Sequence, residues 1–169
     1  EAIGDLPKIL PIIDSKDLKS RIGYSKPSCR TTWHKARHHS LRDVKIYQML
    51  ADDIKSGRNE YVDSKSLSDL YEEKVGAKSP IHRYHVLKAD EPSTTIISHL
   101  DRDGNRFIHY DPEQGRDITP REAARIQSFD DDFEFIGNQT DTYIMIGNAV
   151  PPLLAKCVGL AVSEVLDIL

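Results

Sequence analysis

The chain has 169 residues, of which 38% are hydrophobic and 30% are charged, a composition ordinary for one globular domain with its own core. No signal-peptide pattern opens the sequence and we predict no apolar run long enough to span a bilayer, so we expect a cytoplasmic protein with no membrane partner. The net charge of −4 argues against a uniformly basic nucleic-acid binder, and the distant Cys29 and Cys157 argue against a disulfide framework.

Residues 1–15 are predicted to be a connecting segment. Pro7 and Pro11 limit helix formation there, and Ile9 is one of several apolar side chains that could anchor the segment on a core. We identify no catalytic chemistry in this stretch.

Positive charge is concentrated in the next segment. Between Lys16 and Lys45 there are nine basic residues against two acidic ones, a balance of +7. Lysine and arginine that neutralise DNA phosphates release counterions, which supplies much of the sequence-independent affinity for a duplex. From charge alone, a solvated surface of mixed charge is an equally good interpretation.

Side chains suited to a nucleic-acid groove lie between Ser25 and His39. Arg30 could contact guanine in a bidentate manner, and Thr31 and Thr32 could contact phosphate or a thymine methyl group. Lys26 is a further candidate for a DNA contact. Trp33 is predicted to be a core aromatic that anchors a helix.

Three histidines in this stretch, His34, His38 and His39, could suggest zinc. Adjacent histidines point to different faces, Cys29 is the only nearby thiol, and no paired Cys-x-x-Cys spacing exists. We therefore expect no metal.

Apolar spacing predicts two helices after this stretch. The first runs from about Lys35 to about Lys55 and is stopped by Gly57. The second begins at Ser64 or Ser66 and ends at Gly76. Their inward-facing residues are predicted to be Leu41, Val44, Tyr47, Leu50 and Ile54 in the first helix and Leu67, Leu70 and Tyr71 in the second.

The pattern changes after Pro80. Loose alternation and β-branched residues predict strands at His82–Leu87, Ser93–His99 and Arg106–Tyr110. We expect a small antiparallel sheet in which the last two strands form a hairpin. Thr95 would then belong to a cross-strand threonine pair on a half-buried sheet.

The last third contains clear local signals. Thr119, Pro120 and Glu122 form the pattern of an N-cap, a first helical residue and a capping box, for a helix that ends near Ser128–Phe129. A strand is predicted at Thr142–Ile146, followed by a tight turn at Gly147–Asn148. Such a turn can present backbone N–H groups and a short amide to a ligand, although a purely structural turn is the simpler interpretation.

A long terminal helix opens at Pro151–Pro152. It is apolar but carries Lys156, Glu164 and Asp167, which fits burial against protein better than contact with lipid. Cys157 lies in its middle and is predicted to be a small buried hydrophobic residue.

Two long motifs in this region resemble the last two motifs of the DNA (cytosine-5)-methyltransferases. The first is Ile118-Thr119-Pro120-Arg121-Glu122-Ala123-Ala124-Arg125-Ile126-Gln127-Ser128-Phe129, preceded by Arg116, and the second is Gly147-Asn148-Ala149-Val150-Pro151-Pro152-Leu153-Leu154-Ala155. The stretches Glu1–Pro7 and Glu91–Ile97 are also similar to family segments. The chain departs from the usual pattern at Asp130, where proline is common, and at Met145, where glutamine is common.

The resemblance implies a role for each motif. The turn Gly147, Asn148, Ala149 and Val150 would close over the methionine end of S-adenosyl-L-methionine, and Thr95 would lie near the DNA backbone beside a flipped cytosine. Other motif residues would organise the recognition region without performing chemistry; they are Arg116, Thr119, Arg121, Glu122 and Arg125. Double-stranded DNA is the expected partner.

The resemblance also implies what the chain would need from elsewhere. The family's nucleophilic cysteine follows a proline, yet Cys29 follows Ser28 and Cys157 follows Lys156, and the glycine-rich cofactor motif is absent from the sequence. We expect the C-terminal part of an enzyme, inactive alone, that works with an N-terminal catalytic portion or a separate large subunit. A non-catalytic DNA-binding module derived from such an enzyme is the alternative, and a structural domain with fortuitous motifs is a weaker one.

The expected fold class is α+β. Residues 16–118 would form a small target-recognition domain with helices and a short antiparallel sheet. Residues 119–169 would carry the C-terminal motifs and a helix that packs on the missing α/β domain that binds S-adenosylmethionine.

Overall fold

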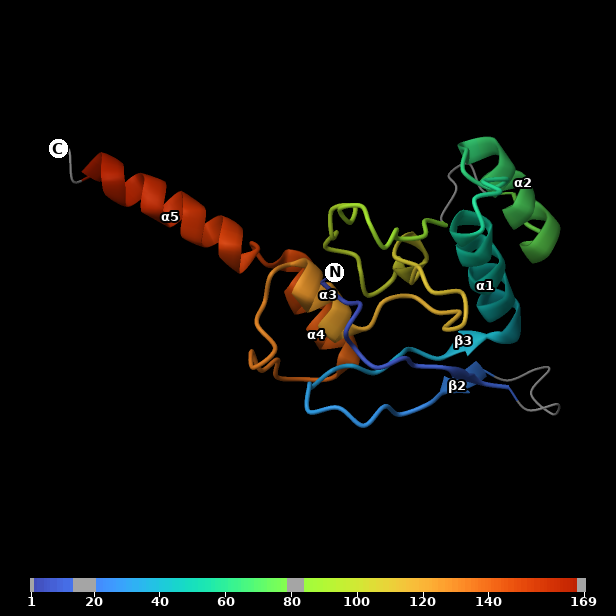
Figure 1. Ribbon diagram of the computed structural model, residues 1–169, viewed down its shortest axis with the longest axis horizontal. Coiled ribbons are helices and arrows are strands. Elements are labelled where there is room, and N and C mark those ends of the chain that lie inside the picture. Colours follow the sequence, from blue (N-terminus) through green and yellow to red (C-terminus); the bar gives the residue numbers. More distant parts are fainter. Residues whose placement is uncertain (1, 14–20, 79–83, 167–169) are drawn as a thin grey trace.

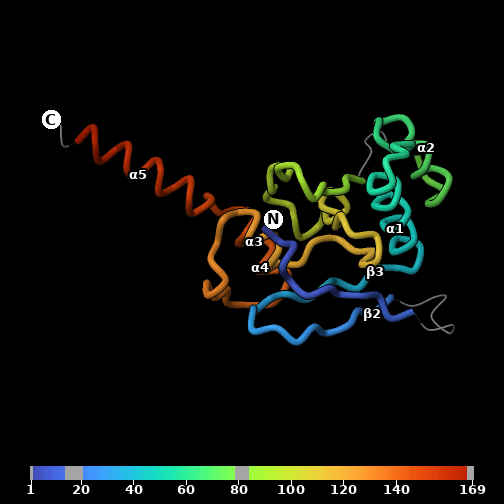
Figure 2. The backbone as a smooth tube through the Cα atoms, in the orientation of Figure 1, coloured from blue at the N-terminus to red at the C-terminus, as the bar shows by residue number. Residues whose placement is uncertain are grey.

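In a computed structural model of the chain, residues 2–13, 21–78 and 84–166 are described. Figures 1 and 2 show the helices α1 and α2 at one end, with β2 and β3 beneath α1, and α5 at the other end, with the pair α3 and α4 between the two ends. The helices span α1 Leu41–Lys55, α2 Ser64–Val75, α3 Pro120–Ile126, α4 Gln139–Asn148 and α5 Pro152–Leu166, with a 3₁₀ turn η1 at Gly104–Arg106. Helices together with a small sheet are consistent with the expected α+β class.

The sheet consists of β1 Pro11–Ile12, β2 Arg21–Tyr24 and β3 His39–Ser40, with β2 in the centre and both neighbours antiparallel to it. Pro11 pairs with Tyr24 and Arg21 pairs with Ser40. The first strand therefore lies inside the segment expected to be a connector, and Ile9 beside it is fully buried.

The predicted position of the sheet was wrong. Among the described residues, 93–99 contain no strand, and Ile108 forms only isolated bridges with Val86 and Asp117. Residues 82 and 83 of the first predicted strand lie outside the described residues. The β-branched run at 93–97 follows Pro92 and takes a loop conformation, so its high strand propensity is overridden by its surroundings.

Helix α1 starts later than predicted. Ser40 is its N-cap, and the Ser40 hydroxyl accepts a hydrogen bond from the Asp43 N–H at 3.1 Å. Residues His39–Ser40 pair with β2, which holds the preceding segment extended and prevents the helix from beginning near Lys35. Its end at Lys55 agrees with the prediction.

Helix α2 confirms its prediction. Its N-cap is Asp63, which accepts hydrogen bonds from the N–H groups of Lys65 and Ser66. Gly76 ends it in the left-handed conformation (φ 74°). Leu67 and Leu70 are buried as expected.

Helix α3 also begins as predicted, with Thr119 at the N-cap, Pro120 in the first turn and a complete capping box with Glu122. The strand predicted at Thr142–Ile146 and the tight turn predicted at Gly147–Asn148 were both wrong, because all these residues belong to α4. A second capping box, formed by Asn138 and Asp141, starts that helix and outweighs the strand propensity of its threonine, tyrosine and isoleucine residues.

Two apolar clusters hold the fold together. One joins α3 and α4 to the loop at 96–107, with Leu100, Ile118, Tyr143 and Ile146 at its centre and Trp33 packed on its edge, in line with the prediction for Trp33. The other lies between α1, α2 and the segment 84–108, around Tyr47, Leu50 and Tyr84. Each side of the molecule therefore has its own core, and α5 belongs to neither.

Candidate functional site

The turn between α4 and α5 leaves one polar side chain open. Asn148 is the last residue of α4 and is exposed, and no described residue forms a hydrogen bond with its amide. Ala149 is extended (φ −77°, ψ 149°), and its N–H donates to Ile146 O at 3.2 Å. Val150 is 63% exposed. Asn148 and Val150 are thus accessible to a ligand or to another protein segment.

Gly147, in the last turn of α4, allows this helix to approach the segment that carries Thr95 closely. A Cβ at position 147 would lie 2.5 Å from the Ile97 carbonyl oxygen and 3.1 Å from the Ser98 Cα. Thr95 is exposed, and the predicted cross-strand pairing has no sheet to support it. The Thr95 segment and the cofactor-like turn are therefore neighbours in space.

Helix α5 projects away from the rest of the molecule (Figure 1). Its first turn is tied to the α3 region, because the Leu153 N–H donates to the Ser128 hydroxyl at 3.1 Å. No α5 residue is buried, and Cys157 is exposed. Among the described residues, none covers this helix or Cys157, both of which were predicted to be buried. Seven large apolar side chains on α5 are 52 to 63% exposed: Leu153, Leu154, Val158, Leu160, Val162, Val165 and Leu166.

The segment Gln139–Leu166 is long and apolar enough to pass a test for a membrane span, and an 18-residue stretch within it has a mean hydropathy of 1.6. The expectation that no apolar run would be long enough was wrong on this measure. Two helices share the segment, however, and in the first of them Thr142, Tyr143 and Ile146 are buried in the protein core.

Arg116 and Glu122 form a buried bidentate ion pair. Their side chains are 0% and 1% exposed, and both guanidinium NH groups donate to carboxylate oxygens at 2.7 Å. Burial alone would raise the pKa of Glu122, but Arg116 and the Thr119 N–H lower it to about 2. The pair therefore stays ionised, and it holds the first turn of α3 against the segment at Arg116 that precedes the helix.

His109 packs against this pair, with Nε2 3.6 Å from a Glu122 oxygen. Burial lowers the pKa of His109 to about 4, although the Glu122 carboxylate opposes that shift. The imidazole is therefore neutral at pH 7.

Arg121 is a second fully buried arginine and has no carboxylate partner in its hydrogen bonds. Its guanidinium donates to the carbonyl oxygens of Thr32, Asp130 and Phe133 at 2.8 to 2.9 Å, and to the Thr32 hydroxyl at 2.8 Å. The Thr32 hydroxyl thus accepts a hydrogen bond from Arg121, while Thr32 itself is exposed.

Arg125 joins the N-terminal segment to the loop after α3. It contacts Asp5 at 2.5 Å and Asp131 through two hydrogen bonds. These ion pairs are partly exposed and contribute little stability by themselves.

The predicted DNA-contact residues fall into two groups. Lys26 and Arg30 are exposed and Thr31 is half-buried, all in the loop after β2. In Figure 1 this loop lies below the α3–α4 pair, whereas the loop that carries Thr95 lies above it. The structure therefore does not bring Thr95 together with the Lys26–Thr32 loop.

One buried charge cluster was missed by sequence reasoning. Asp117 is nearly inaccessible and pairs with Arg37 and, at 2.9 Å, with His39 Nε2. Burial would raise the pKa of Asp117, but Arg37 and His39 lower it to about 2. The adjacent Gly104 leaves no space for a side chain, since a Cβ would lie 2.0 Å from an Asp117 oxygen. No local pattern marks Asp117 as the partner of Arg37 and His39, which lie 80 and 78 positions earlier in the chain.

The three histidines considered for zinc have separate environments. His34 lies 2.8 Å from Pro7 O and 3.2 Å from the Thr119 hydroxyl, and His39 faces Asp117. Within residues 2–13, 21–78 and 84–166, no three His, Cys, Asp or Glu side chains are grouped to hold a metal ion.

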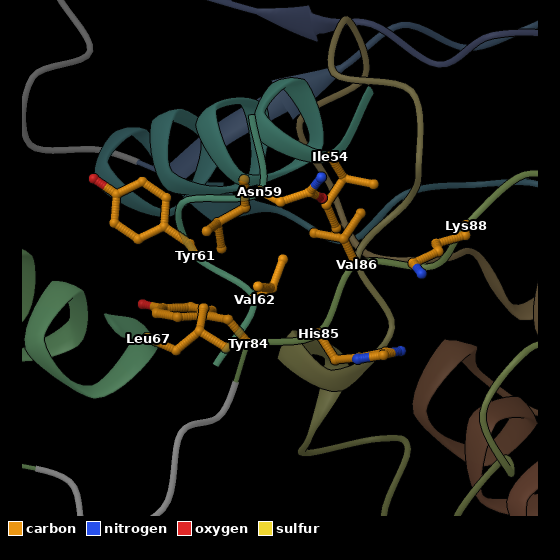
Figure 3. Close-up of a pocket in the computed structure, with 10 residues that line it drawn as sticks. Ile54, Asn59, Tyr61, Val62, Leu67, Tyr84, His85, Val86 and Lys88 are labelled. Atoms are coloured by element: carbon orange, nitrogen blue, oxygen red, sulfur yellow. The ribbon is translucent and has the colours of Figure 1, made fainter. Parts of the chain in front are cut away.

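A cavity of about 250 Å³ lies between the loop after α1 and the segment 84–88 (Figure 3). Figure 3 shows Val62, Leu67 and Tyr84 close together at one end, with His85 and Lys88 at the other. Its described walls are mainly apolar and belong to the α1–α2 core. None of the predicted cofactor or DNA residues lines it.

Comparison with known proteins identifies relatives of this chain. A family model described as C-5 cytosine-specific DNA methylase matches residues 8–164. The type II methyltransferase M.Bpa9945I of Bacillus paralicheniformis is 37% identical over 136 residues, which cover 80% of this chain and 30% of that protein. The putative type II methyltransferase M.OihORF3336P of Oceanobacillus iheyensis is 31% identical over 202 residues, with 97% and 43% covered. The chain thus spans less than half the length of these two relatives.

Proposed function

The chain belongs to the C-5 cytosine-specific DNA methylase family, and from this premise we propose that it supplies target recognition and part of the cofactor pocket of a DNA (cytosine-5-)-methyltransferase. The complete enzyme would transfer a methyl group from S-adenosyl-L-methionine to C5 of cytosine in a specific DNA sequence. The relatives named above are type II methyltransferases, which supports a role in restriction-modification.

The reaction needs a nucleophile that we do not assign to this chain. C5 of cytosine becomes nucleophilic when a thiolate adds to C6 of the flipped base. Cys29 is half-buried with Sγ 3.6 Å from the Thr31 carbonyl oxygen, and Cys157 is on the projecting α5. Another segment of the same protein, or a separate large subunit, would supply the cysteine and most of the cofactor site.

The observation that carries this proposal is the uncovered apolar surface of α5. A 15-residue helix is marginal in water without a packed face, so α5 requires a partner surface. Asn148 and Val150 are exposed at its base, where a second protein body covering α5 would meet them.

Protein fits this surface better than lipid. Helix α5 has 15 residues, whereas a span needs about 20, and α4 is anchored in the core through Tyr143 and Ile146. Lys156 and Glu164 would also be costly in hydrocarbon.

The open turn fits the cofactor. The Asn148 amide has both donors and an acceptor available, and Gly147 through Val150 would line the methionine end of S-adenosylmethionine. When bound, the cofactor supplies the methyl group. Asn148 would orient it, and the covered α5 would exclude water.

The test is co-expression with the N-terminal catalytic portion of a relative, followed by bisulfite mapping of methylated cytosines. Methylation should require both pieces, and Asn148→Ala should raise the KM for S-adenosylmethionine while the complex still assembles. Tritium transfer from labelled cofactor by the isolated chain, or no methylation by any assembled complex, would contradict the proposal.

A non-catalytic DNA-binding module is the second candidate, favoured by the basic segment at Lys16–Lys45 together with the unassigned nucleophile. Stable binding of duplex DNA combined with a persistent failure to assemble with any catalytic portion would favour it. A Pro-Cys motif and a glycine-rich loop in the same or an adjacent reading frame would argue for the enzyme.

A further inference from the structure

The loop after β2 and the segment before β3 enclose a groove of about 610 Å³. Its basic and imidazole side chains come from Lys26, Lys35, His34 and His38, and its hydroxyl groups come from Tyr24 and Ser25. Ile12, Pro27 and Ala36 form apolar parts of its wall. None of its described lining residues is acidic. The groove therefore combines positive charge with surface suited to a sugar.

The positive charge of this groove is uncompensated. Neither Lys26 nor Lys35 forms an ion pair with any described residue, and the His38 ring has no described hydrogen-bond partner, whereas His34 is engaged by Pro7 and Thr119. The chain has 27 acidic residues in 169, yet residues 18–42 contain none. Such a gap concentrates positive potential where the groove lies.

A neighbouring cavity of about 370 Å³ provides a contrast. It shares His38 with the groove and contains Arg21, Arg37 and Arg102, but Asp43, Asp101 and Asp117 also line it. Arg37 already forms an ion pair with Asp117, so its charge is neutralised within the protein. An anion would therefore meet competing carboxylates there and none among the described walls of the first groove.

We propose that the groove lined by Lys26, Lys35 and His38 holds the sugar–phosphate backbone of duplex DNA. This inference rests on the proposed function and adds Lys35 and His38 as backbone contacts. A duplex strand carries a regular row of phosphates, and the two lysines and the imidazole would contact this row while Ile12 and Pro27 face the sugars. Such contacts position the protein without reading sequence.

The decisive variant is Lys26→Gln/Lys35→Gln in the whole chain. Binding to a fluorescent duplex would be followed by anisotropy from 50 to 300 mM salt. The loss of two phosphate contacts should reduce the slope of log K against log salt by about 2 and weaken binding at 100 mM salt by up to roughly 60-fold. His38→Glu, which places a carboxylate in the groove, should weaken binding further.

The matched control is Lys65→Gln/Lys78→Gln, which removes the same charge from exposed positions in and beyond α2. Circular dichroism would verify that both double variants are folded. Equal losses in both double variants would overturn the groove assignment and leave DNA binding by the chain intact. If Lys26→Gln/Lys35→Gln abolished binding to anionic lipid vesicles but left DNA binding unchanged, the groove would be assigned to a membrane surface and the DNA assignment would be overturned.

Absence of duplex binding by the unsubstituted chain would also overturn the groove assignment. The methylation assay of the assembled complex then decides separately on the proposed function, because methylation by a complex whose recognition part has no groove contact would leave that function standing.

Discussion

Gly147 in α4 lies against the backbone of Ile97, so close that a Cβ would come within 2.5 Å of the Ile97 carbonyl oxygen. The glycine of the second motif is therefore required by the Thr95 segment, independently of any ligand. A single close contact links the turn proposed for the cofactor to the segment proposed for DNA.

Gly147→Ala is expected to destabilise the fold. Overpacking costs about 1–3 kcal/mol, against a gain of about 1 kcal/mol from the helix propensity of alanine. Thermal unfolding would measure the change. Gly159→Ala is the matched control, because nothing lies within 4 Å of its added Cβ in α5. Equal melting temperatures for the two variants would contradict the close approach.

Removing one partner of the Arg116–Glu122 pair is expected to destabilise the fold far more than breaking an exposed pair. Glu122→Gln leaves the Arg116 charge buried without its partner, which costs about 3–5 kcal/mol of unfolding free energy. Glu91→Gln, which breaks the exposed pair with Lys88, should change stability little.

A double-mutant cycle provides the sharper measurement. Glu122→Gln combined with Arg116→Met should destabilise less than the sum of the two single substitutions, because the second removes the charge that the first leaves unpaired. Additive losses, measured by denaturant unfolding, would show that the two residues act independently.

Local signals explain which elements were predictable. The Thr119 capping box and Gly76 each mark a helix end within a few residues, so α3 and α2 could be placed from sequence. The strands could not be placed from sequence. For example, β3 has only two residues and is formed by pairing with Arg21 and Ile22 of β2. Helix α4 was misassigned because its β-branched composition masked the Asn138–Asp141 box.

The site shows the same division. Motif residues such as Arg116 and Glu122 could be identified by resemblance, since they lie close together in sequence. Arg37 and Asp117 are 80 positions apart, and their pairing depends on the space left by Gly104. Only the folded arrangement reveals that Arg37 is unavailable to DNA while Lys35 is open.

His109 is expected to make stability depend on mildly acidic pH. Its pKa is about 4 in the folded protein against 6.5 for the free side chain, so unfolding takes up a proton between these values. Stability from this group is fully present above pH 6.5 and is lost as pH falls toward 4, by at most roughly 3 kcal/mol.

His109→Gln should flatten unfolding free energy against pH between 6.5 and 4, as measured by urea unfolding. Glu122 acts at lower pH: its lowered pKa stabilises the fold above about 4.5, and that contribution is lost as pH falls toward 2. The substitution should keep this second decline but move it to higher pH, because His109 also helps to lower the pKa of Glu122. An unchanged slope in the His109 window would show that the imidazole is not held neutral by burial.

Helix α5 is expected to make the isolated chain self-associate. Its seven exposed apolar side chains lie on a helix that contacts neither core, and their hydration is thermodynamically unfavourable. Leu154→Gln/Val158→Gln removes two of them four residues apart and should weaken self-association by roughly 10-fold or more, since each buried aliphatic side chain contributes about 1.5–3 kcal/mol. Lys156→Gln, between them on the same helix, should leave association unchanged. Sedimentation and binding of a hydrophobic dye would measure both variants, and a dye-silent monomer for the unsubstituted chain would mean that α5 needs no partner.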